Sequence, residues 1–196
     1  MTVTSIIGII ISSILIENYI FSRFLGICPF LGLSDKTSNA VGMGLAVTFV
    51  MAVSTAVTWC IYHFVLVPFE LEYLKTIAFI LVIASLVHLL EMFLRKMVPA
   101  LYAALGIYLP LITTNCAILG SALLCIQNGY NFLESIIFST GSALGFTMAI
   151  VIFSFVRERV ALADTPKCFK GVPIALVTAG LIAMAFAGFS SIKLGL

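Results

Sequence analysis

Long apolar stretches, separated by short polar connections, account for most of the chain. Each is close to the about 20 residues that a helix needs to cross about 30 Å of hydrocarbon. Six such stretches run from Val3 to Ile27, Ala40 to Val67, Leu74 to Leu94, Leu101 to Cys125, Phe132 to Val156 and Val172 to Ile192. The pattern predicts an all-α integral membrane protein with six transmembrane helices. The short connections predict one membrane domain, residues 1–196, without a soluble domain.

Composition excludes a soluble protein. Of the 196 residues, 62% are hydrophobic and 9% are charged, with a mean hydropathy of +1.24, whereas soluble domains have about 25% charged residues. The first apolar stretch lacks a basic leading region and a small-residue cleavage site. We therefore expect it to be a retained span and not a signal peptide.

The basic residues are distributed unevenly between the connections. Lys75 and Lys193 fall on one side of the predicted membrane. Seven others fall in the first, third and fifth connections: Lys36, Arg95, Lys96, Arg157, Arg159, Lys167 and Lys170. By the positive-inside rule, these odd-numbered connections face the cytoplasm. Both termini are then expected on the periplasmic side.

The two halves of the chain, approximately residues 1–98 and 99–196, resemble each other. A C-x-x-x-G motif begins at Cys28 and again at Cys116, and the sequence LAVT in the first half corresponds to LGFT at an offset of 99 residues. Each half holds three predicted spans, which is an odd number, so the second half must cross the membrane upside down. Inverted repeats of this kind place functional sites near the midplane.

Helix-breaking residues lie beside both cysteine motifs. These residues are Gly26 and Pro29 in the first half and Gly106 and Pro110 in the second. Proline removes a backbone donor and glycine loosens a helix, so the first and fourth helices are predicted to be interrupted. The alternative is that glycine and proline are simply common in membrane helices.

The five cysteines do not form a disulfide framework, because their number is odd and none lies in an extracellular loop pattern. Cys60, Cys125 and Cys168 are interpreted as small buried hydrophobic residues. The repeat places Cys28 and Cys116 at equivalent depths. Two thiolates there would repel each other unless a metal neutralised them, and soft thiolates select iron–sulfur clusters, zinc or copper(I).

An iron–sulfur cluster usually needs four cysteines, and this chain offers two at the expected depth. The other two would come from a second subunit with the same repeat. Thr113, Thr114 and Asn115 precede Cys116 and are candidate hydrogen-bond donors to sulfur. Their alternative role is polar contact between helices.

Two carboxylates are candidates for an ion pathway. Glu17 lies deep in the first predicted span, where an ionisable residue is a functional candidate, although it could instead pair with Arg23. Glu91 lies near the cytoplasmic end of the third span and could mark where cations enter. Its ordinary explanation is an exposed pair with Arg95, four residues later. His63 and His88 are interpreted as interfacial or packed residues, not as ligands.

Four segments of the sequence resemble one known family. FLGICPFLGLSDK, GMGLAVTFVM, LGIYLPLITTNCAILG and RERVALAD are similar to the family of A-type subunits of the Rnf electron transport complex. The E-type subunit of the sodium-pumping NADH:quinone reductase is a near relative of that family. The likeness covers essentially the whole chain.

The resemblance implies a membrane subunit of an ion-translocating ferredoxin:NAD⁺ oxidoreductase in the bacterial inner membrane. It implies a homologous inverted partner, similar to the E-type subunit of the Rnf complex, and a [2Fe–2S] cluster held by two cysteines from each. On this sequence those ligands are Cys28 and Cys116. Electron transfer in the complex is coupled to sodium or proton movement.

Two functions of other classes remain as alternatives. A secondary transporter for a small solute or ion would also suit inverted repeats with broken helices. The matched cysteines and the small number of spans count against it. The second alternative is a purely structural scaffold subunit.

Overall fold

The computed structural model describes residues 18–69, 71–97, 109–163 and 166–190, together with Gly8, Ile10, Ser13 and Ile14. This part of the chain is helical and contains no β-strand, which confirms the predicted all-α class. In chain order the elements are α2 (Ile27–Leu33), α3 (Thr37–Ile61), the π-helix η2 (Tyr62–Leu66), the 3-10 helix η3 (Glu72–Leu74), α4 (Lys75–Met97), α6 (Leu109–Thr113), α7 (Cys116–Gln127), α8 (Phe132–Ala161), the 3-10 helix η4 (Lys167–Phe169) and α9 (Val172–Ser190).

Three helical segments are long and apolar enough to cross a membrane. They are Thr37–Leu66, Lys75–Met92 and Phe132–Ala161, and they agree with the second, third and fifth predicted spans. The fourth and sixth stretches contain shorter apolar helices, Leu111–Gln127 and Val172–Gly188. The first stretch lies largely outside the described residues. Residues 18–26 of this stretch are not helical, and the next helix begins at Ile27.

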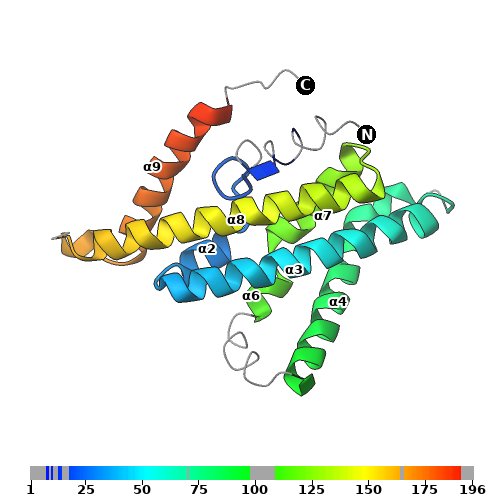
Figure 1. Cartoon of the computed structure of the whole chain (residues 1–196), viewed down its shortest axis with the longest axis horizontal. Coiled ribbons are helices and arrows are strands. Elements are labelled where there is room, and N and C mark those ends of the chain that lie inside the picture. The colour runs from blue at the N-terminus through cyan, green and yellow to red at the C-terminus, as the bar shows by residue number, and fades with distance from the viewer. Residues whose placement is uncertain are drawn as a thin grey trace.

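Helices α3 and α8 lie side by side at the centre of the molecule and run in opposite directions (Figure 1). Near one end of the pair, the Thr37 hydroxyl donates to Oε1 of Glu158 over 2.8 Å. Near the other end, Nε1 of Trp59 donates to the backbone carbonyl of Tyr130 over 3.1 Å. These contacts connect α3 to α8, or to the residues just before it, near both ends of the pair.

The middle of this helix pair contains the two threonines that the sequence comparison of the two halves matches. The hydroxyl oxygens of Thr48 and Thr147, which are 99 residues apart, lie 3.4 Å from each other. Each hydroxyl also donates over 2.8 Å to the carbonyl four residues earlier, that of Gly44 or of Ala143. A side chain at Gly44 would collide with Thr147. Glycine therefore allows the close approach that is typical of membrane helix pairs.

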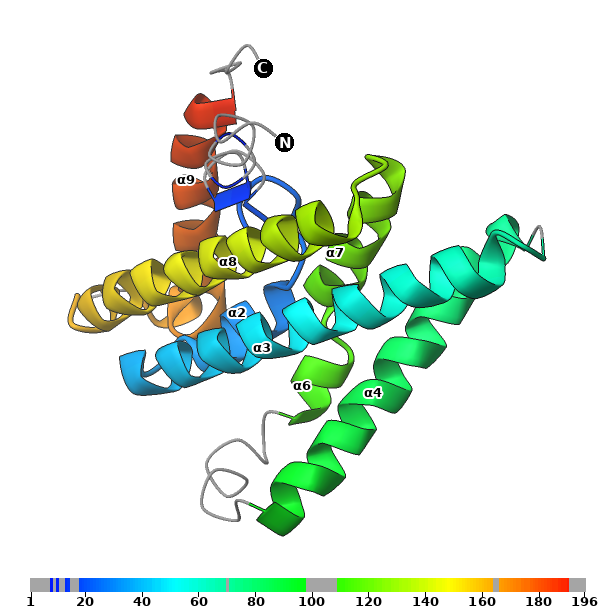
Figure 2. The ribbon, with the colours of Figure 1, turned by 45° about the vertical axis from the view of Figure 1, so that its right-hand side comes forward.

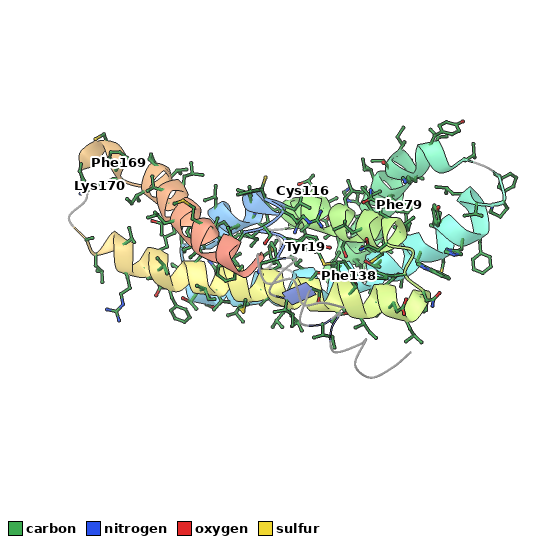
Figure 3. The ribbon with its side chains drawn as sticks, turned by 90° about the horizontal axis from the view of Figure 1, so that it is seen from above. Tyr19, Phe79, Cys116, Phe138, Phe169 and Lys170 are labelled. Atoms are coloured by element: carbon green, nitrogen blue, oxygen red, sulfur yellow. The ribbon has the colours of Figure 1, made fainter. Side chains whose placement is uncertain are left out.

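The remaining helices surround this pair asymmetrically. Helix α4 leads back from the end of α3, and α9 leads away from the end of α8 (Figure 2). Helices α2 and α7 meet near the middle of the molecule, on one side of α8 (Figure 3). Large apolar side chains are exposed on α4 and α9, including Leu81, Leu181 and Met184. Such a surface is expected to face lipid or another membrane subunit.

Candidate metal centre

The first break in the chain includes Asn18, whose side chain is fully buried. Its Oδ1 accepts hydrogen bonds from the backbone N–H groups of Ile20 and Phe21, over 3.1 and 3.3 Å. Its Nδ2 donates to the backbone carbonyl of Gly145, in the middle of α8, over 3.0 Å. A buried amide needs such partners. They attach the non-helical segment 18–26 to α8.

This break ends at Gly26, the residue before α2, which has a left-handed backbone with a φ of 78°. Pro29 lies in the first turn of α2. A proline costs little there, because the N–H groups of the first turn have no partner within the helix. Residues 18–26 are not helical, so a break precedes Cys28, and Pro29 follows that break.

The second break consists of Thr114 and Asn115, between α6 and α7. The Oδ1 atom of Asn115 accepts a hydrogen bond from the N–H of Ala117 over 3.1 Å and so caps the start of α7. Pro110 is the second residue of α6, four residues before this break. Gly106 lies outside the described residues.

Both predicted ligands lie in the first turn of a helix that follows a break. Cys28 is the second residue of α2 and Cys116 is the first residue of α7, and both are free and exposed. The N–H of Gly26 donates a hydrogen bond to Sγ of Cys116 over 2.9 Å. Gly26 precedes Cys28 by only two residues, so the structure brings the two cysteine segments together. Cys116 lies near the middle of the molecule (Figure 3).

The side chains in this region fit one half of a thiolate metal site. Two free thiols are exposed, and an amide N–H points at one sulfur, an arrangement that stabilises negative charge there. Nδ2 of Asn115 is buried without a hydrogen-bond partner among the described residues. Across the described part of the chain, no three His, Cys, Asp or Glu side chains are grouped to hold a metal ion. The described residues therefore contain no complete metal site, and Cys28 and Cys116 remain predicted ligands.

The other cysteines differ from one another. Cys125 is buried in α7, where its thiol contacts the carbonyl of Ser135 over 3.7 Å, as expected for a buried hydrophobic residue. Cys60 is partly buried in α3. Cys168 is exposed in η4, so the interpretation of this residue as buried is wrong.

The structure bears only partly on the predicted ion pathway. Glu17 lies outside the described residues. Glu91 has an Oε2 atom 3.5 Å from Nδ1 of His88, three residues earlier on the same helix. This pair is partly exposed, so its contribution to stability is small. The predicted pairing with Arg95 involves a side chain outside the described part of the chain.

A polar clamp near the end of α8 was not expected from the sequence. Nη1 of Arg157 donates to the Leu31 carbonyl and to the Ser34 hydroxyl, over 2.7 and 2.8 Å, and Nη2 lies 2.7 Å from a carboxylate oxygen of Asp35. The sequence predicts for Arg157 only that it belongs to a connection facing the cytoplasm. Its contacts attach the end of α2, the helix that carries Cys28, to α8.

Two hollows lie close to these elements. A cavity of about 520 Å³ next to the clamp is lined by charged side chains, among them Asp35, Arg157 and Lys170. A smaller, apolar hollow of about 160 Å³ lies between the first break and α9, with Phe24 and Leu176 in its lining. A solute site on interrupted helices would be expected at a break. The larger cavity instead lies at the end of α8, away from the second break.

Comparison with known proteins gives a consistent result. Residues 6–193 match the family described as "Rnf-Nqr subunit, membrane protein". The chain is 59% identical to the A-type subunit of the Na(+)-translocating ferredoxin:NAD(+) oxidoreductase complex of Acetobacterium woodii, over 97% of this chain and 100% of the relative. It is 55% identical to the A-type subunit of the ion-translocating oxidoreductase complex of Syntrophotalea carbinolica, over 95% of this chain and 97% of the relative. The corresponding subunit of Aeromonas salmonicida is 50% identical over 96% and 98%.

Proposed function

Because the chain belongs to the Rnf-Nqr family of membrane subunits, we propose that it carries electrons within an ion-translocating ferredoxin:NAD⁺ oxidoreductase complex. Cys28 and Cys116 would provide two of the four ligands of a [2Fe–2S] cluster. A homologous membrane subunit would provide the other two. The main support is that segments 90 residues apart are joined by the Gly26–Cys116 hydrogen bond, and that the thiols of Cys28 and Cys116 are both free and exposed.

The ligand count supports a shared site. Iron–sulfur clusters are usually held by four cysteines. In this chain Cys125 is buried against Ser135, and Cys168 lies in the connection between α8 and α9. A second chain with the same two breaks could complete the ligand set at the exposed surface of α2 and α7.

The proposed topology is six spans in two inverted halves. Its support comes from α3 and α8, which run in opposite directions, and from the contact between Thr48 and Thr147. A residue can contact its own equivalent only near the axis that relates two repeats. In this topology the breaks before Cys28 and Cys116 lie near the midplane of the membrane.

When bound, a [2Fe–2S] cluster accepts and releases one electron at a time, and near the midplane it divides the about 30 Å of hydrocarbon between the two faces of the bilayer. The protein's contribution would be to hold the two thiolates in place. Asn18 and Asn115 satisfy backbone groups where the helices stop. Unwound backbone is tolerated at this depth only where protein covers it.

The experiment is EPR spectroscopy and iron analysis of the purified complex after reduction with dithionite. We expect a reduced-cluster signal that disappears in Cys28→Ser and in Cys116→Ser. Cys168→Ser is the matched control, because this thiol is also exposed but lies in a connection between helices, and it should keep the signal. If the variants at Cys28 and Cys116 retain the signal and its iron, the proposed relay is wrong. A complex without iron would favour the transporter alternative.

A further inference from the structure

The hydrogen bond between Gly26 and Cys116 connects the two halves of the chain at the proposed ligands. The donor is a backbone N–H at the end of the first break, and the acceptor is Sγ of the first residue of α7. The donor and acceptor residues are 90 positions apart. The contact therefore depends on tertiary structure and not on local capping within α7.

The surroundings of Gly26 allow only a glycine to bring its amide to this position. Its φ of 78° lies in the left-handed region, which residues with a Cβ rarely adopt. A Cβ atom there would lie 2.8 Å from Cε2 of Phe146 in α8. It would also lie 3.4 Å from both Cβ of Ala117 and Oδ1 of Asn115. Gly26 is thus packed between α8 and the start of α7, and a larger residue would strain the left-handed backbone and force either the Phe146 ring or the backbone to move.

We propose that Gly26 is a positioning residue for the metal centre, whose N–H orients the sulfur of Cys116 and raises the reduction potential of the bound cluster. This inference rests on the proposed function. Hydrogen bonds to the sulfurs of a cluster are one of the main determinants of its potential. A donor stabilises the reduced state more than the oxidised state, because the added electron increases the negative charge on the ligands.

This role differs from that assigned to the second break by the sequence. Thr113, Thr114 and Asn115 directly precede Cys116 and are the predicted donors to sulfur. The oxygen of the Asn115 side chain instead caps α7 by accepting from Ala117. The donor that reaches Cys116 comes from the opposite half of the chain.

The test combines pulsed EPR with redox titration of the whole complex. With glycine labelled with nitrogen-15, we expect a nuclear coupling between the reduced cluster and a glycine amide nitrogen. Gly26→Ala should abolish this coupling and shift the midpoint potential of the cluster to a lower value, since the displaced backbone weakens the hydrogen bond. Gly42→Ala is the matched control, because a Cβ at Gly42, in α3, meets no atom within 4 Å. It should leave both the coupling and the potential unchanged.

Two results would overturn the inference while the proposed function stands. One is a cluster signal without a coupling to any glycine nitrogen in the wild-type complex. The other is an unchanged midpoint potential in Gly26→Ala. If Gly26→Ala does not assemble, the coupling in the wild-type complex decides, since its presence supports the contact and its absence refutes it. Absence of the cluster itself refutes the proposed function instead.

Discussion

Asn18 and Asn115 are the two buried asparagines that accompany the breaks in the chain. At membrane depth, every backbone N–H and C=O group that leaves a helix needs a partner within the protein. The Asn18 side chain satisfies two N–H groups and one carbonyl, and Asn115 satisfies the N–H of Ala117. Each polar side chain thus stabilises a local unwinding that positions a cysteine.

Replacing Asn18 should destabilise the subunit strongly. Asn18→Leu keeps a similar volume but leaves the N–H groups of Ile20 and Phe21 and the carbonyl of Gly145 without their partner. Each unsatisfied buried group costs about 1–3 kcal/mol. We expect a clearly lower thermal unfolding midpoint for the purified complex, together with loss of iron. Asn39→Leu, at a half-buried site in the first turn of α3, should have little effect. Equal destabilisation by the two substitutions would contradict this role of Asn18.

At the scale of elements, neighbouring charges on α8 hold the ends of two other helices. Arg157 donates to the Leu31 carbonyl at the end of α2, and Glu158 accepts from the N–H and hydroxyl of Thr37 at the start of α3. A cation near the end of a helix and an anion near the start of one are both electrostatically favourable. The pair therefore fixes the α2–α3 turn, and with it the helix that carries Cys28.

Arg157→Ala should loosen α2. The Arg157 side chain is 19% exposed and makes charge-assisted hydrogen bonds to Leu31 and Ser34, and such bonds contribute about 1.5–3 kcal/mol each. We expect a lower thermal unfolding midpoint and less iron per complex. Arg157→Lys should restore only part of both, because an ammonium lacks the planar fork of donors. The matched control is Arg159→Ala, at an exposed position two residues later. Normal stability and iron content in Arg157→Ala would show that the clamp is dispensable.

The elements differ in how far the sequence could predict them. Helices α3, α4 and α8 follow from long apolar stretches, since length and hydropathy decide membrane spans. The positions of the breaks do not follow from proline, because Pro29 lies in a first turn that tolerates it. The first break depends on the contact of Asn18 with Gly145, 127 residues away. No pattern within a short stretch of sequence predicts a contact between residues so far apart.

The candidate site also has features that the sequence predicts and features that it does not. The C-x-x-x-G motif predicts Cys28 and Cys116 as ligands, because it recurs in both halves of the same sequence. The hydrogen bond from Gly26 to Cys116 could not be derived, since it depends on how two distant segments pack. The Arg157 contact with Leu31, across 126 residues, was missed for the same reason.

At the scale of the whole molecule, the connections after α2 and α8 lie at the same end. The ion pair between Asp35 and Arg157 joins the first of them to the last part of α8, and Lys170 of the second lines the cavity beside it. Both connections belong to the basic set that the positive-inside rule places in the cytoplasm. The connection between α7 and α8, which includes Asn128, lies at the other end of α8.

This arrangement predicts opposite accessibility for two ends of α8, which a membrane-impermeant maleimide can measure in sealed vesicles of known orientation. Cys168 is exposed in η4, after α8, and should be labelled in inside-out vesicles only. A cysteine introduced by Asn128→Cys, at an exposed position before α8, should be labelled in right-side-out vesicles only. Cys168→Ser identifies the labelling that comes from the native thiol. Labelling of both sites from one side would contradict a membrane-spanning α8, because its 30 residues extend about 45 Å as a helix. The reverse pattern would instead place the termini in the cytoplasm.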